Sequence, residues 1–119
     1  MRAVSRFVPP LALMAVIFAL SAQPDLSTDL GVWDTILRKA AHMASYGLLW
    51  WLWWRALGHR HAAVAVAITL AYAASDEFHQ SFVRGRHGTP VDVLIDAAGV
   101  ALAGLAVVLH ARRRRRVAE

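Results

Sequence analysis

The chain contains no cysteine, and charged residues make up only 18% of its 119 residues. The absence of cysteine excludes disulfide bonds, thiolate metal ligands and thiol nucleophiles. Soluble domains average about 25% charged and ~45–50% apolar residues, whereas apolar residues form 58% of this chain. A soluble domain of this length would need more polar side chains to cover its surface. The composition therefore predicts one small domain that exposes apolar side chains to lipid.

Apolar stretches occupy most of the chain and are joined by short polar segments. A helix needs about 20 mostly apolar residues to cross a membrane. The predicted spans cover residues 8–22, 36–54, 62–80 and 90–110, and a basic tail follows at 111–119. Most of the connections have the lengths that are typical of helical bundles. The sequence thus predicts an all-α, polytopic membrane protein in which residues 1–119 form a single four-transmembrane-helix bundle.

The first apolar stretch has a second interpretation. Arg2 and Arg6 precede an apolar run, and small residues end that run at Ser21 and Ala22. A basic start, an apolar core and a small-residue end are also typical of a cleavable signal peptide. Cleavage would leave three spans, so at this point both a retained and a cleaved first span remain open.

The basic residues are unevenly placed along the chain. The formal net charge is +5, which in a soluble protein would suggest a nucleic-acid partner. However, Arg112–Arg116 directly follow an apolar stretch, as a cytoplasmic anchor of a membrane protein does. With four spans and both termini inside, nine of the thirteen basic residues are cytoplasmic. We therefore predict cytoplasmic termini, a lipid bilayer as the main partner and no nucleic-acid partner.

Four tryptophans lie at the end of the second predicted span. Trp50, Trp51, Trp53 and Trp54 come just before Arg55, where an aromatic belt would meet the inner lipid headgroups. The same cluster could form an aromatic slot for a cofactor. Nothing else in the sequence suggests such a group, so we predict interfacial anchors and no cofactor.

Polar residues gather at the outer ends of the last three spans. Ionisable side chains within a span cost about 2.5–3.5 kcal/mol on insertion scales, so they face the bundle interior and normally pair. We therefore expect one pocket in which buried acids and bases are tuned for proton transfer. Its members are His42 and Tyr46 from the second span, Asp76, Glu77, His79 and Gln80 from the third, and Asp92 and Asp96 from the fourth.

Each of these residues receives a predicted role. The candidate catalytic residues are His42, Asp76, Glu77 and His79, and the candidate binding residues are Tyr46, Gln80, Arg84, Arg86, Asp92 and Asp96. Arg84 and Arg86 suit a phosphate clamp, because guanidinium groups bind phosphate oxygens bidentately, although the same segment could be a simple connector. Asp92 could equally serve as a first-turn acid that stabilises a helix beginning at Pro90.

A metal site is not predicted. The sequence has no His-Glu-x-x-His pattern, and Glu77 and His79, two residues apart on one helix, point in directions about 200° apart. If a metal were bound, His42, His79 and one carboxylate would be the expected ligands.

Several motifs together resemble the VanZ-like family of small membrane proteins. They are Ser21-Ala22-Gln23-Pro24, the Arg-Lys-Ala-Ala-His-x-x-x-Tyr stretch from Arg38 to Tyr46, Asp76-Glu77-x-His79-Gln80, Arg84-Gly85-Arg86, and Asp92 with Asp96 and Gly99. The resemblance covers nearly the whole chain. It implies a multi-pass protein of the bacterial cytoplasmic membrane and a link to resistance against glycopeptide antibiotics such as teicoplanin. Asp96 departs from the asparagine that is common in the family at this position.

Two functional hypotheses of different classes follow. In the first, the outer pocket binds or modifies an anionic lipid headgroup or a lipid-linked cell-envelope precursor. His79 or Glu77 would act as general base, His42 as acid, and the two arginines would hold the anion. In the second, a non-enzymatic membrane protein alters envelope permeability or binds antibiotic, and the polar residues only hold the helices together. Whether the protein is an enzyme stays open, and a homodimer is compatible with either hypothesis.

Overall fold

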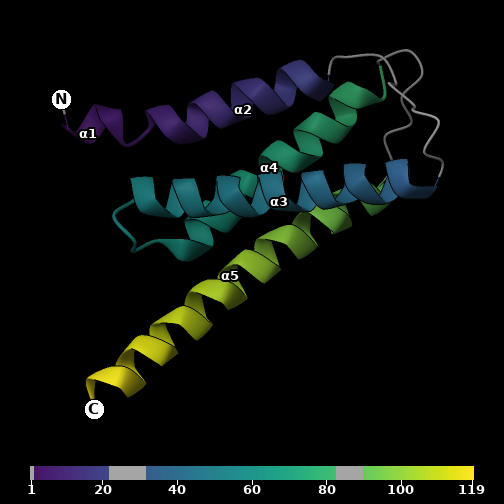
Figure 1. The fold of residues 1–119 in the computed structure, drawn as a ribbon. Coiled ribbons are helices and arrows are strands. Elements are labelled where there is room, and N and C mark those ends of the chain that lie inside the picture. The colour runs from purple at the N-terminus through teal and green to yellow at the C-terminus, as the bar shows by residue number, and fades with distance from the viewer. Residues whose placement is uncertain (1, 22–31, 83–89) are drawn as a thin grey trace.

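The computed structural model describes residues 2–21, 32–82 and 90–119, and these residues are almost entirely helical (Figure 1). The elements are α1 (Arg2–Ser5), α2 (Val8–Ser21), α3 (Val32–Ala56), α4 (Ala62–Gln80) and α5 (Pro90–Ala118). The described residues contain no strand. The all-α prediction is therefore confirmed, with one long helix at each predicted apolar stretch.

The helix bounds differ from the predicted spans at two places. α4 has the predicted bounds, whereas α3 begins at Val32 and is longer at both ends. α5 continues through the arginine run to Ala118 instead of giving way to a separate tail at residue 111. Arginine is a good helix former, and no glycine or proline interrupts this run. The basic segment is thus a continuation of the last helix.

Helix length and apolar composition distinguish α5 from the other described helices. α5 is long and apolar enough to cross a membrane, and among the described residues no other helix meets both criteria. The apolar helix Val8–Leu20 is shorter, and α3 carries Arg38, Lys39 and Arg55 within its length. The structure therefore confirms four long helices, of which one, among the described residues, is long and apolar enough to cross a membrane.

The helices pack as a bundle with α3 at its centre. α3 contacts α2, α4 and α5, and α4 also contacts α2 and α5 (Figure 1). The core cluster of buried apolar side chains draws on all four long helices: Ile17, Tyr46, Leu49, Trp50, Ala65, Ala73 and Val100. Many large apolar side chains on α2 and α5 remain exposed, among them Leu11, Phe18, Leu94 and Leu102. Such a surface is what a lipid-facing bundle requires.

Two glycines allow α3 and α5 to cross in close contact. A Cβ added to Gly99 would lie 2.7 Å from the Cα of Met43, and one added to Gly47 would lie 2.9 Å from the carbonyl oxygen of Gly99. Both distances are to backbone atoms, which cannot move aside without separating the helices. Small residues at a crossing are typical of helix pairs in membranes. This crossing fixes which side chains of α3 and α5 meet.

The turn between α3 and α4 lies at the same end of the bundle as α1 and the C-terminal end of α5 (Figure 1). This turn uses the left-handed backbone region, with φ of 74° at Gly58 and 61° at His59. Trp50 and Trp54 stack next to it with ring centroids 5.5 Å apart. Trp50 is only 5% exposed and donates to the carbonyl oxygen of Ala62 over 3.3 Å. Trp50 is therefore a core residue, and only its neighbours remain available as interfacial anchors.

Candidate functional site

The opposite end of the bundle carries a group of polar side chains from three helices. We call His42, Tyr46, Asp76, Glu77, Gln80 and Asp96 the polar cluster. The buried face of α4 explains how its members enter the interior, because Ala65, Thr69 and Ala73 occupy this face before Asp76, Glu77 and Gln80. These positions recur every three to four residues and so share one side of the helix. This face carries small side chains toward the start of α4, and two carboxyl groups and one amide toward its end.

His42 and Asp96 join α3 to α5. The Nδ1 atom of His42 lies 3.1 Å from Oδ1 of Asp96. Asp96 is completely buried, whereas the His42 side chain is 32% exposed. The second carboxylate oxygen of Asp96 is also buried and has no hydrogen-bond partner among the described residues. The pair therefore leaves one inward-facing acceptor oxygen open.

Tyr46, Asp76 and Gln80 join α3 to α4. The hydroxyl of Tyr46 donates to Oδ2 of Asp76 over 3.1 Å, and Nε2 of Gln80 donates to the same oxygen over 3.2 Å. All three side chains are buried. Two donors on one carboxylate oxygen fix the orientation of Asp76, and its other oxygen is buried without a hydrogen-bond partner in the described part of the chain.

Glu77 makes the fewest hydrogen bonds of the side chains in the polar cluster. It is 7% exposed, and within the described ranges neither of its carboxylate oxygens has a hydrogen-bond partner. Glu77 interacts electrostatically with Asp76, Asp92, Asp96 and His42. Its neighbour Phe78 is 69% exposed and faces away from the bundle. Glu77 therefore points into an interior that is rich in carboxylates.

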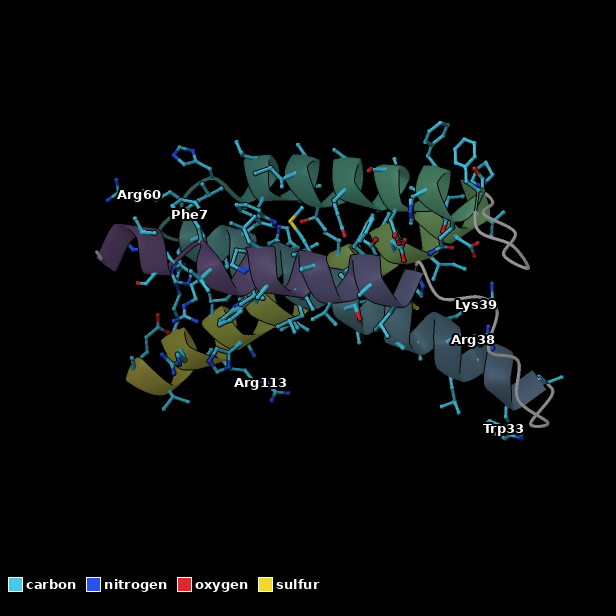
Figure 2. All side chains as sticks on the ribbon, turned by 90° about the horizontal axis from the view of Figure 1, so that it is seen from above. Phe7, Trp33, Arg38, Lys39, Arg60 and Arg113 are labelled. Atoms are coloured by element: carbon cyan, nitrogen blue, oxygen red, sulfur yellow. The ribbon has the colours of Figure 1, made fainter. Side chains whose placement is uncertain are left out.

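Lys39 lies at the margin of the polar cluster. Its Nζ atom is 3.8 Å from Oδ1 of Asp92, and the two side chains are 47% and 31% exposed. Figure 2 shows Arg38 and Lys39 toward the end of the bundle opposite Arg60 and Arg113. α5 begins at Pro90, as the sequence predicted, so Asp92 lies in its first turn. Asp92 thus lies in the first turn of α5 and also pairs with a cation of α3. Lys39 was not among the site residues predicted from the sequence.

His79 has a different environment from the rest of the predicted pocket. Its ring lies against Phe18 of α2, with centroids 4.6 Å apart and an angle of 31° between the planes. Its Nδ1 atom is buried without a hydrogen-bond partner among the residues described here. His79 thus joins α4 to α2, while His42 joins α3 to α5. Sequence spacing could not show this difference, since it depends on which helix packs against each side of α4.

The remaining predicted site residues have no structural description. Arg84 and Arg86 lie outside the described residues, so their role as a phosphate clamp stays a prediction. In the described ranges, no three histidine or acidic side chains are grouped closely enough to hold a metal ion. The described chemistry of the site therefore consists of one imidazole, one phenol, one amide and three buried carboxylates.

The fold and the polar cluster define a small helical protein with one helix apolar enough to cross a membrane and with ionisable groups enclosed at one end. A family model described as VanZ/LLP1 matches residues 3–111. The uncharacterized membrane protein YwnJ of Bacillus subtilis (strain 168) is 34% identical over 111 residues, covering 87% of this chain and 77% of that protein. No solved structure matches the chain. The chain belongs to the VanZ/LLP1 family, which confirms the family that its motifs resemble.

Proposed function

We propose that this protein spans the bacterial cytoplasmic membrane four times, with both termini in the cytoplasm and the polar cluster near the outer face. The arrangement in Figure 1 supports this topology, since α1, the α3–α4 turn and the end of α5 share one end of the bundle. The basic residues Arg55, Arg60 and Arg112–Arg116 belong to that end. Lys and Arg are retained on the cytoplasmic side.

The packing of α2 supports a retained first span. Ile17 lies in the core, and the hydroxyl of Tyr72 donates to the carbonyl oxygen of Met14 over 2.6 Å. Loss of α2 would expose the α3 and α4 side chains that it covers. Alkaline phosphatase or green fluorescent protein fused to the C-terminus tests the proposed topology. Green fluorescence supports cytoplasmic termini, and phosphatase activity would contradict them.

We propose that the polar cluster binds or modifies an anionic lipid headgroup or a lipid-linked cell-envelope precursor. The supporting observation is that ionisable side chains of α3, α4 and α5 meet at one end of the bundle and leave buried oxygens open. Buried polar groups in a membrane protein that lack internal partners are candidates for a functional site. Through such a site the protein would contribute to the glycopeptide resistance that is associated with this family.

The catalytic form of this proposal assigns proton transfer to the histidines and Glu77. Glu77 or His79 would remove a proton, His42 would return one, and Arg84 with Arg86 would hold the phosphate. The test compares lipid extracts, by mass spectrometry, from cells with and without the gene and from cells with His42→Ala, Glu77→Ala or His79→Ala. A lipid species that depends on the gene and on these residues supports catalysis. Identical lipid profiles in all strains would contradict it.

The hydrogen bonds between helices favour a second function, without catalysis. Both the His42–Asp96 contact and the Tyr46–Asp76 bond connect different helices, so the polar cluster could serve only to hold the bundle together while the protein alters envelope permeability or binds antibiotic. In that case the same substitutions would lower stability and antibiotic tolerance in parallel. No lipid product would depend on them.

A further inference from the structure

The acceptor oxygens left open in the polar cluster define the chemistry of a missing partner. They are Oδ1 of Asp76, Oδ2 of Asp96 and both carboxylate oxygens of Glu77, all buried and without hydrogen bonds among the described residues. Each can accept hydrogen bonds and none can donate while ionised. A partner that satisfies them must therefore carry several donors.

When the three carboxyl groups are ionised, these oxygens also carry negative charge in a buried setting. Asp76, Glu77 and Asp96 are 2%, 7% and 0% exposed, respectively. Burying carboxylates close together is costly unless a cation joins them. His42 is a basic group in contact with these carboxylates, and it bonds one oxygen of Asp96. A neutral hydroxyl donor would leave most of this charge uncompensated, whereas an ammonium group supplies three donors and a positive charge.

We propose that the polar cluster receives the primary ammonium group of a phospholipid headgroup, with Glu77 as its main contact. This inference rests on the proposed function, since it takes the same site and narrows its ligand to a headgroup that carries an ammonium group beside its anionic phosphate. A phosphoethanolamine headgroup carries groups that are complementary to both parts of the site. Its ammonium reaches the buried carboxylates, and its phosphate stays near the half-exposed Lys39 at the margin. The headgroup approaches past His42 and Asp92, which are both partly exposed.

Substitution of Glu77 gives the most direct test of the ammonium site. A glutamate that bonded another helix would be needed for packing, but neither oxygen of Glu77 does so within the described residues. Replacing it with glutamine keeps the size and removes the charge. Glu77→Gln should therefore fold as the wild type does and lose affinity for the ammonium group. Glu119→Gln is the matched control, because it makes the same chemical change at an exposed residue of the opposite end.

The experiment titrates the purified full chain in detergent with single phospholipids and counts bound lipid by native mass spectrometry. Phosphatidylethanolamine and phosphatidylcholine carry the same charges, but the methylated nitrogen of phosphatidylcholine has no N–H donor. We expect phosphatidylethanolamine to bind on the order of tenfold more tightly than phosphatidylcholine, as the loss of charge-assisted hydrogen bonds requires. Glu77→Gln should reduce this preference to about twofold or less, and Glu119→Gln should leave it unchanged.

Phosphatidylglycerol separates this inference from the proposed function, because it is anionic and has no ammonium. Equal binding of phosphatidylethanolamine and phosphatidylcholine, with tighter binding of phosphatidylglycerol, would overturn the ammonium site and leave the anionic headgroup proposal intact. Equal binding of all three lipids would overturn both. A thermal unfolding midpoint that falls clearly in Glu77→Gln in lipid-free detergent would also overturn the inference, since it would show that Glu77 pairs with a cation of the chain itself.

Discussion

The imidazole of His42 and the carboxylate of Asp96 are 3.1 Å apart although 54 residues separate them in the chain. This contact lies beside the close crossing of α3 and α5, since Met43 and Gly99 touch there. Backbone approach and side-chain bonding thus occur at the same level of the bundle. The crossing sets the distance between the two helices, and the pair sets their rotation relative to each other.

Removing His42 should destabilise the bundle. In His42→Ala the completely buried Asp96 loses its partner, and an unpaired buried charge costs more than the bond itself contributes. We expect a loss of about 2–3 kcal/mol in the free energy of unfolding, measured in detergent micelles by circular dichroism. The double variant with Asp96→Asn should recover part of this loss, because no buried charge remains. Equal stability of His42→Ala and wild type would contradict the pairing.

A methyl group at Gly99 should separate α3 from α5. The added Cβ would lie 2.7 Å from the Cα of Met43, and overpacking of this kind costs about 1–3 kcal/mol. Thermal unfolding of Gly99→Ala measures the effect. Gly104→Ala is the control in the same helix, because its added Cβ meets only the Trp50 ring at 4.0 Å. Alanine is the better helix former, so this control should be neutral or slightly stabilising.

Tyr46→Phe should weaken the contact between α3 and α4 without leaving a cavity. Phenylalanine fills the same buried space, while Asp76 loses the donor that now lies 3.1 Å from its Oδ2. Gln80 still donates to that oxygen, so we expect a moderate loss of about 1–2 kcal/mol. Chemical unfolding in detergent measures it. In the background of Asp76→Asn the same tyrosine substitution should cost clearly less, and an undiminished cost would show that Tyr46 acts through another group.

Tyr72→Phe should loosen α2 alone. Its hydroxyl bonds the carbonyl oxygen of Met14 over 2.6 Å, and loss of one such bond is worth about 1 kcal/mol. Because the natural chain has no cysteine, a cysteine at the buried Ile17 gives a specific label. Its thiol should react on the order of fivefold faster in the Tyr72→Phe variant. A cysteine at the exposed Val16 should react at the same rate in both backgrounds.

The positions of the helices could be predicted from the sequence, and so could the end of the bundle at which the polar residues gather. Apolar stretches, turn residues and Pro90 marked α4 and the start of α5 closely, because these signals are local. The spacing of Asp76 and Gln80 placed both on one side of α4. The predicted last span ended at residue 110, and the structure adds that the helix itself continues through the arginines to Ala118, because arginine supports a helix.

Contacts between helices could not be read from the sequence in the same way. His42 and His79 carry the same chemistry on neighbouring helices, yet one bonds Asp96 and the other packs on Phe18. Their partners depend on how far each helix is rotated, and that rotation is set by the crossing at Gly47 and Gly99. Trp50 is buried for the same reason, because its side of α3 faces α4.

The position of the tryptophans gives the molecule a built-in optical reporter. Trp50 and Trp54 stack with an angle of only 7° between their rings, and Trp54 also meets the His59 ring edge to face. Trp33, by contrast, is 67% exposed at the start of α3. With Trp33 replaced by phenylalanine, ultraviolet emission would come entirely from the end that holds the α3–α4 turn. Tryptophan fluorescence would then report unfolding of that end of the bundle. A dye attached near His42 would report unfolding of the end that holds the polar cluster.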